Sequence, residues 1–112
     1  MDLARREINN VFASVDLIVT PTMKTTAPLI APTQGSTGAG GRGAPAGGGA
    51  GGNTAQFDVY GLPTISVPCG FSSSGLPIGL QMSGAHWAES TVLALAHAYE
   101  QTTDWHTRRP RL

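Results

Sequence analysis

Residues 64–82 read TISVPCGFSSSGLPIGLQM, and this stretch decides the fold. Ile65 and Val67 alternate with polar residues, which is the pattern of a half-buried strand. The same alternation returns over residues 78–82. The serines and the glycine over residues 72–75 are typical of a turn. The sequence therefore predicts an antiparallel hairpin with a long turn.

A helix is expected after this hairpin. Apolar side chains recur there at the spacing i, i+3, i+4, i+7, which marks one face of a helix, at Val92, Leu95, Ala96 and Tyr99. Glu89 lies near the start, where a negative charge interacts favourably with the helix dipole. This spacing predicts an amphipathic helix after the hairpin.

A second helix and a third strand are predicted near the N-terminus. The helix is indicated by apolar residues on one face, Ala4, Ile8, Val11, Phe12 and Val15. Residues 17–20, LIVT, follow as a β-rich run that Pro21 ends. Because this run is apolar or β-branched throughout, we expect a buried strand and not an alternating edge strand.

A Gly/Ala-rich segment divides the chain. Residues 35–52 contain ten glycines and four alanines, so they offer few side chains for a core and are expected to form a linker. The predicted organisation is a helix–strand piece at 1–34, a linker at 35–52 and a hairpin–helix piece at 53–112. Three strands with apolar faces call for layers on both sides, which 112 residues do not supply.

Composition excludes several classes of protein. Seven Lys+Arg balance seven Asp+Glu, whereas proteins dedicated to nucleic acids or membrane surfaces carry a positive excess. A single cysteine excludes an internal disulfide and a cysteine-based zinc site. Apolar runs fall short of the roughly 18–20 residues of a membrane span, and the charged start does not resemble a secretory signal. We expect a cytoplasmic protein with no metal or other cofactor.

Several motifs together resemble the C-terminal end of amidase-signature enzymes. They are residues 57–71, FDVYGLPTISVPCGF, residues 75–81, GLPIGLQ, and residues 95–101, LAHAYEQ, followed by Trp105-His106. Residues 16–22, DLIVTPT, resemble the strand that precedes them in that family. The resemblance covers both pieces of the chain but not the linker.

The resemblance implies both a fold and a chemistry. The fold is α/β, and this chain is expected to be the incomplete C-terminal part of a mixed sheet flanked by helices. The family hydrolyses carboxamides with a serine nucleophile, a second serine and a lysine as base. Those residues belong to upstream segments that match nothing here, so the resemblance implies no catalytic residue in this chain and no hydrolysis by it alone.

Three local resemblances to catalytic groups are interpreted as structural. Ser72, Ser73 and Ser74 lie in the predicted turn, so they are expected to be solvated and not nucleophilic. Lys24 is expected to be a solvated loop residue. Cys69 has no neighbouring positive charge or helix N-terminus in sequence to activate its thiol, which favours a small buried hydrophobe.

The spacing and flanking residues of the other candidates do not indicate a metal, dinucleotide or RNA site. His86, His97 and His106 are not spaced like a metal-binding pair on a helix. The glycines of residues 38–43 match a dinucleotide-binding pattern without its flanking strand and helix, and Arg42 alone is too little charge for RNA. The C-terminal arginines, Arg108, Arg109 and Arg111, are expected to form a solvated tail.

Within the family, the sequence favours a general amidase. The A subunit of tRNA-dependent amidotransferases, such as the glutamyl-tRNA(Gln) amidotransferase, usually carries the pattern D-x-[FY]-T-x-P-x-N-x-x-G-L-P before the hairpin. Gly51 replaces its aspartate, Asn53 its aromatic residue and Asp58 its asparagine, and ahead of the matching G-L-P only Thr54 fits. The resemblance implies that this carboxylate helps to hold the amine of glutamine. Its loss weakens a glutamine-specific interpretation, so the A subunit of a tRNA-dependent enzyme is the first alternative to a general amidase.

Two further interpretations stay open. In the first, the chain is a non-catalytic module that completes a split amidase through its sheet edge. In the second, it is a truncated reading frame without a role of its own. The expected partner is the rest of an amidase-like chain, with a small amide as substrate only after completion. Nucleic acid and membrane are not expected partners.

Overall fold

The computed structural model describes residues 2–27 and 53–109. Its elements are α1 (Asp2–Val11), β1 (Leu17–Pro21), α2 (Thr54–Tyr60), β2 (Thr64–Phe71), β3 (Pro77–Gly84), α3 (Glu89–Thr102) and a short 3₁₀ helix, η1 (Trp105–Thr107). The helix, strand, hairpin and helix predicted from sequence are confirmed. The predicted linker at 35–52 lies outside the described residues, so the three-part division of the chain stays a prediction.

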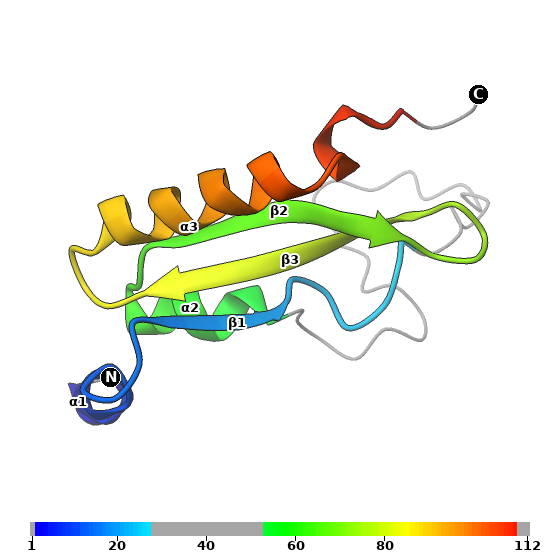
Figure 1. Ribbon diagram of the computed structural model, residues 1–112. Coiled ribbons are helices and arrows are strands. Elements are labelled where there is room, and N and C mark those ends of the chain that lie inside the picture. Colours follow the sequence, from blue (N-terminus) through cyan, green and yellow to red (C-terminus); the bar gives the residue numbers. More distant parts are fainter. Residues whose placement is uncertain (1, 28–52, 110–112) are drawn as a thin grey trace, which may run out of the picture.

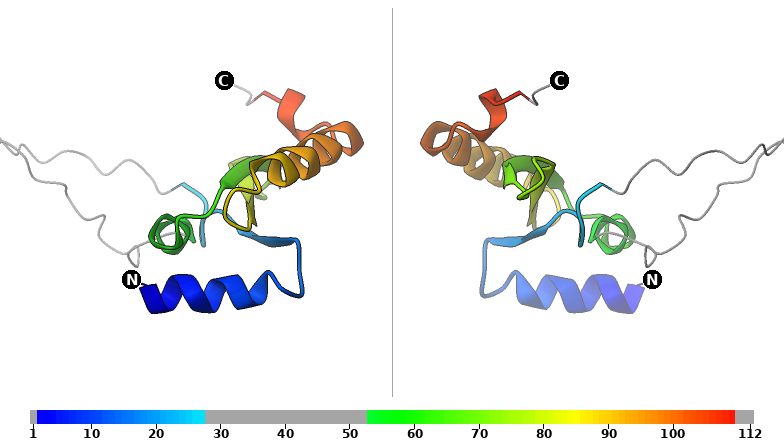
Figure 2. Two further views of the ribbon diagram at one scale, coloured as in Figure 1. Left: turned by 90° about the vertical axis from the view of Figure 1, so that its left-hand side faces the viewer. Right: turned by 90° about the vertical axis from the view of Figure 1, so that its right-hand side faces the viewer.

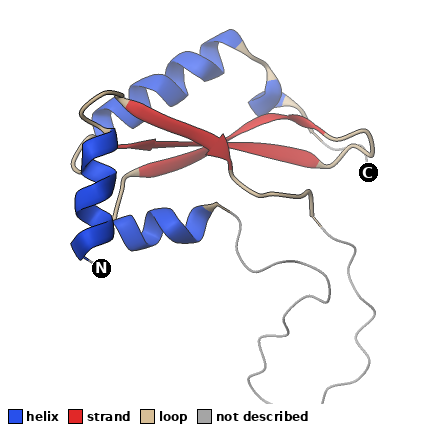
Figure 3. Ribbon diagram, turned by 90° about the horizontal axis from the view of Figure 1, so that it is seen from below, coloured by secondary structure: helices blue, strands red, loops and turns tan. Residues whose placement is uncertain are grey.

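The three strands form one antiparallel sheet in the order β1-β3-β2. Two of the helices, α1 and α2, lie on one side of this sheet and α3 lies on the other (Figures 1 and 2). Figure 3, seen from below, places α1 and α2 in front of the strands and α3 behind them. The result is an α/β layer arrangement whose central strand is β3. The expectation that this chain would not supply layers on both sides of the sheet is wrong, because helices from both ends of the chain reach opposite faces (Figure 2).

The main core lies between the sheet and α3. Met82 is only 2% exposed and packs with Val67 of β2 and Ala96 of α3. Ile65, Leu80, Leu95 and Tyr99 surround them. Gly84 permits a close approach of the helix, because a Cβ built there would lie 2.7 Å from Cγ2 of Val92. The predicted helical stripe is therefore confirmed as the core-facing side of α3.

One helix was not predicted, the seven-residue α2. Its only periodic signal is the pair Phe57 and Tyr60, whose rings meet edge-on at 6.2 Å between centroids. The helix ends at Gly61, which adopts a left-handed conformation with φ 69° and donates its N–H to the Phe57 and Asp58 carbonyls. Such a glycine terminates helices because a side chain is disfavoured there. A helix this short gives too few turns for a pattern search.

Two predictions near the N-terminus are wrong in detail. The helix ends at Val11, because Ser14 caps the Val11 carbonyl through both its backbone N–H and its hydroxyl. Phe12 and Val15, which were predicted to lie on the helix, therefore come after its end. β1 is not buried, since Val19 is 50% exposed. Among the described strands β1 lies at a sheet edge and pairs only with β3, which leaves one flank uncovered.

Candidate functional site

The face of the sheet toward α2 is lined by uncharged polar side chains. Cross-strand partners on this face include Thr64 with Ser83 and Gln81 with both Ser66 and Thr20. Ser83 is fully buried and its hydroxyl lies 2.9 Å from that of Thr64. Because residues of opposite parity are apolar and face α3, the strands divide a polar surface from an apolar core.

The hydroxyl groups of Thr22 and Ser66 are hydrogen-bonded at 2.6 Å. These two residues come from opposite sides of the central strand and meet above Gly79. A Cβ on Gly79 would lie 2.8 Å from Oγ1 of Thr22 and 2.9 Å from Oγ of Ser66. The absence of a side chain at Gly79 is therefore what lets the two hydroxyls approach each other.

Asn53 joins the start of α2 to this surface. Its side-chain amide donates to the Pro21 carbonyl at 2.7 Å, and its backbone N–H donates to the Thr22 carbonyl at 3.1 Å. The buried Gln81 donates from Nε2 to the Asn53 carbonyl at 3.4 Å and to Oγ1 of Thr20 at the same distance. The buried side-chain amide of Gln81 therefore has one hydrogen-bond partner on β1 and another just before α2.

We call Thr20, Thr22, Asn53, Ser66 and Gln81 the polar cluster. Its hydroxyl and amide groups can donate and accept hydrogen bonds, which suits recognition of another amide or carbonyl. Activation of a hydroxyl as nucleophile needs an adjacent base. Within residues 2–27 and 53–109, no His, Lys, Asp or Glu side chain is hydrogen-bonded to Thr22 or Ser66. In the described part of the chain, the cluster therefore offers hydrogen-bond donors and acceptors, and its two hydroxyls bond each other without a neighbouring base.

The serines excluded as nucleophiles lie in the hairpin turn between β2 and β3. Ser72 donates its backbone N–H to the Leu76 carbonyl at 2.8 Å, and its hydroxyl accepts the Leu76 N–H at 3.1 Å. The Ser74 hydroxyl lies 2.9 Å from that of Ser72. These bonds close the turn, while Ser73 is exposed.

Among the described residues, the hydrogen bonds of the polar cluster do not involve Lys24 or Cys69. Lys24 is exposed in the segment after β1. Cys69 is half-buried and has no cross-strand partner, because the register of the hairpin shifts between Pro68 and Gly70. It is therefore the extra residue of a β-bulge, less buried than expected.

The three histidines are dispersed. His86 bridges two helices, with Nε2 donating to the Tyr60 carbonyl at 2.9 Å and Nδ1 lying 2.9 Å from Oδ1 of Asn9. His97 and His106 are exposed. Within the described ranges, no group of three or more His, Cys, Asp and Glu residues is arranged to hold a metal ion.

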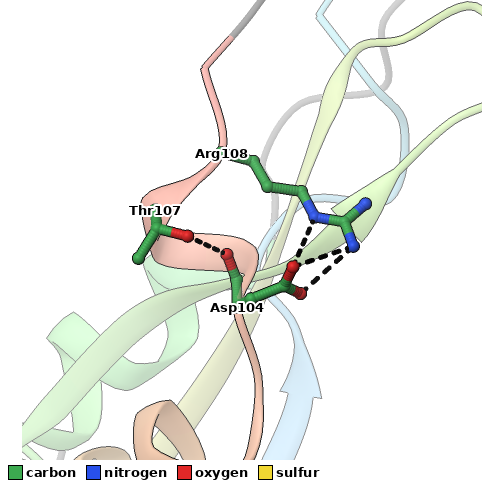
Figure 4. Close-up of polar contacts among 3 residues, drawn as sticks. All are labelled: Asp104, Thr107 and Arg108. Carbon is green, nitrogen blue, oxygen red and sulfur yellow. Dashed lines mark hydrogen bonds and ion pairs between the residues drawn. The ribbon is translucent and has the colours of Figure 1, made fainter.

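The predicted solvated tail is partly ordered. Arg108 donates three hydrogen bonds to the Asp104 carboxylate at 3.0–3.1 Å, and Thr107 donates to the Asp104 carbonyl (Figure 4). The Arg108 guanidinium carbon lies 4.4 Å from the centroid of the Trp105 ring. The centroids of the Trp105 and Phe71 rings are 6.3 Å apart. Arg108 is exposed, as predicted, and its local contacts with Asp104 and Trp105 fix the direction of its side chain. Arg109 is exposed.

Some sequence-level candidates fall outside the described residues. These are the glycine pattern at 38–43, Arg42, Gly51 and Arg111. Thr54 and Asp58, which entered the comparison with the amidotransferase pattern, are exposed on α2.

The polar cluster was not predicted from the sequence. Its signal is present in the alternation of Thr64 and Ser66 with Ile65 and Val67, but that alternation by itself indicates only a strand. The partners across the sheet, such as Thr22 and Asn53, depend on register and on the position of α2. These are tertiary features that no local pattern contains.

The chain belongs to the amidase family. The sequence model of that family, described as Amidase, matches residues 1–93. This confirms the resemblance found in the motifs, and the α/β fold class agrees with the solved structures that the chain resembles. The three described strands are all antiparallel, so the parallel pairings of a mixed sheet are not among them.

Curated relatives share part of the chain at high identity. The chain is 60% identical over 57 residues to the A subunit of glutamyl-tRNA(Gln) amidotransferase from Brevibacillus brevis, and 53% identical over 57 residues to that from Ralstonia nicotianae. Each match covers 51% of this chain and 12% of the relative. The chain thus spans a small part of the length of these relatives.

Solved structures extend the match to nearly the whole chain. The 6-aminohexanoate cyclic dimer hydrolase superposes with a TM-score of 0.70 and 29% identity, covering 96% of this chain and 23% of that protein. The A subunit of the Thermotoga maritima glutamyl-tRNA(Gln) amidotransferase gives 0.61 and 31%, covering 88% and 20%. In the described part of this chain, no helix is long and apolar enough to span a membrane.

Proposed function

We propose that this chain is the C-terminal part of an amidase-family amide hydrolase, which releases ammonia from a carboxamide once the rest of the enzyme is supplied. Two observations carry the proposal: the Amidase family model matches residues 1–93, and 96% of this chain superposes on 23% of the 6-aminohexanoate cyclic dimer hydrolase. The second observation supports hydrolysis of an amide bond, and the release of ammonia is the part that the chimera assay below tests. In this role the sheet is a scaffold, and the polar cluster is a hydrogen-bonding wall for an amide group.

The chain alone is expected not to hydrolyse amides. Acyl transfer to a serine needs a base within hydrogen-bond reach and donors for the developing oxyanion. The hydroxyls of Thr22 and Ser66 are hydrogen-bonded to each other, and the one lysine of the sequence is an exposed loop residue. This supports inactivity of the free chain.

Ammonia release from simple amides tests this expectation. The purified chain is incubated with acetamide, hexanamide, benzamide and glutamine, and ammonia is compared with a protein-free control. We expect no release above that control. Turnover that disappears in a Ser66→Ala variant would overturn the expected inactivity of the free chain. Ser73→Ala, on the exposed turn, is the matched control and should leave such turnover unchanged.

A chimera tests the role in a complete enzyme. Residues 51–112 of this chain replace the corresponding C-terminal segment of the Brevibacillus brevis relative, whose matched segment is 60% identical. We expect the chimera to fold and to release ammonia from a simple amide. A folded chimera without any amide hydrolysis contradicts the proposed role as scaffold and wall.

The second candidate function is the C-terminal part of the A subunit of a glutamyl-tRNA(Gln) amidotransferase. The identity of 51–60% to proteins of that name favours it, whereas Gly51 stands at the place of the aspartate expected to hold the glutamine amine. In the chimera, hydrolysis of glutamine at the parental rate would favour this candidate. Hydrolysis of simple amides with glutamine activity restored only by Gly51→Asp would favour a general amidase.

A third candidate is a separate, non-catalytic chain that completes a split amidase. Relatives named as subunits of an amidotransferase make a partner chain reasonable. Co-purification with a longer amidase-like chain would support it, and a monodisperse monomer with cooperative unfolding would oppose it. The cytoplasmic location expected from sequence stays a prediction.

A further inference from the structure

A hollow of about 560 Å³ lies between the segment that follows β1 and the start of β3. Figure 1 shows this segment, in cyan, running from β1 toward the end of the hairpin where β2 ends and β3 begins. Its volume lies within the range of about 300–1,000 Å³ that is usual for small-molecule sites. The polar cluster described above does not line it.

The wall of the hollow is mostly apolar, and within residues 2–27 and 53–109 α3 does not cover this part of the sheet face. Pro21 is the cross-strand partner of Leu80, and Ile78 lies two residues from Leu80 on the same face. On this face α3 packs against β2 and β3, and η1 packs against β2. Pro21, Ile78 and the neighbouring Met23 remain exposed and line the hollow together with Pro77.

Among the described residues that line the hollow, one is a cation. Lys24 is the only lysine in the sequence, and it borders the hollow beside Thr25 and Thr26. In the described part of the chain, the ion pair is that of Arg108 with Asp104, so Lys24 has no carboxylate partner there. A hydrocarbon-lined wall with a single ammonium group is complementary to a molecule with an apolar body and one negative charge.

We propose that this hollow binds a small aliphatic carboxylate. Lys24 pairs with the carboxylate, Thr25 and Thr26 offer hydroxyl donors, and Met23, Pro21 and Ile78 contact the hydrocarbon chain. The site is one of binding, with no covalent step. It is independent of the proposed amide hydrolysis, because its test measures binding to the free chain and does not use turnover.

The methionines provide a direct readout. In protein labelled with ¹³C at the methionine methyl groups, Met23 lies at the hollow and is 55% exposed, whereas Met82 lies in the core at 2% exposure. Hexanoate and octanoate are titrated and the methyl shifts followed. We expect saturable movement of the Met23 signal, a stationary Met82 signal, and about two- to fourfold tighter binding for each added methylene that the hollow covers.

Two comparisons isolate the charge. Hexylammonium and 1-hexanol have the same chain without the carboxylate, and both are expected to bind more weakly than hexanoate. Lys24→Gln should lower the affinity for hexanoate by about fivefold, which is the upper end for an exposed ion pair. The affinity for 1-hexanol should stay unchanged. Arg109→Gln is the matched control, since it removes an exposed positive charge elsewhere. It should change neither the affinity for hexanoate nor that for 1-hexanol.

Three results would overturn the proposal. They are the absence of saturable Met23 movement with hexanoate and octanoate, equal affinity for hexanoate, hexylammonium and 1-hexanol, and a Met23 signal that moves with protein concentration alone. The last result would identify this surface as a contact between two copies of the chain. None of the three affects the ammonia-release assay, so failure of this proposal is distinguishable from failure of the proposed function.

Discussion

The hydroxyls of Thr22 and Ser66 meet at 2.6 Å across the central strand, above a glycine that has no side chain to separate them. This contact ties the segment after β1 to β2, although the two strands are not neighbours in the sheet. It also marks the exposed end of a polar surface that continues inward to the buried Gln81 and Ser83. Strand alternation, register and the position of α2 together build this polar surface.

Gly79→Ala is expected to destabilise the chain by about 1–3 kcal/mol. The new methyl would lie under 3 Å from both hydroxyl oxygens, so the hydrogen bond must break or the strands must move. Chemical denaturation measures the loss. In a Thr22→Ala, Ser66→Ala background the same substitution should cost clearly less, and an equal cost in both backgrounds would refute this steric origin.

Met82→Ala is expected to cost about 2–5 kcal/mol of unfolding free energy. Met82 is 2% exposed beneath α3, so truncation leaves a cavity between β3 and the helix. Leu93→Ala on the outer side of α3, where the side chain is 58% exposed, serves as control and should cost less than about 1 kcal/mol. Comparable losses at the two positions would mean that α3 is not packed as described.

Gly61 should tolerate asparagine better than alanine. Its φ of 69° is left-handed, which asparagine adopts more readily than alanine does. We expect Gly61→Ala to lower stability by about 1 kcal/mol or more and Gly61→Asn to lower it by less. Thermal unfolding followed by circular dichroism ranks the two variants, and the reverse order would contradict the helix end at Gly61.

Arg108→Ala should have a small effect that depends on salt. Its ion pair with Asp104 has side chains 48% and 65% exposed, and such pairs contribute only about 0–1 kcal/mol. The stacking on Trp105 adds about 0.5–1 kcal/mol at an exposed site. Unfolding at low and at high ionic strength should show the difference between parent and variant shrinking with salt. Trp105→Ala, which also removes the contact with Phe71, is expected to cost more than Arg108→Ala.

Sequence patterns predicted the hairpin and α3 well because both are strongly periodic. Each of these elements carries its own apolar face, so local spacing suffices to find it. Prediction was weaker where the pattern was short or flanking contacts decided the outcome. The seven residues of α2 offer one aromatic pair, and the end of α1 depends on the Ser14 cap. The exposure of Val19 reflects its place at the edge of the described sheet, which its own sequence does not encode.

The sequence by itself determined the family, the two strands of the hairpin and the helix that follows them, because each rests on residue types at short spacings. Only the tertiary structure decided which polar residues meet. Asn53 joins Pro21 and Gln81, Thr22 joins Ser66, and Lys24 borders an apolar hollow, since each relation joins segments that are distant in sequence or lie on different strands. Such contacts depend on strand order and register, which arise from the packing of the whole sheet and not from any one segment.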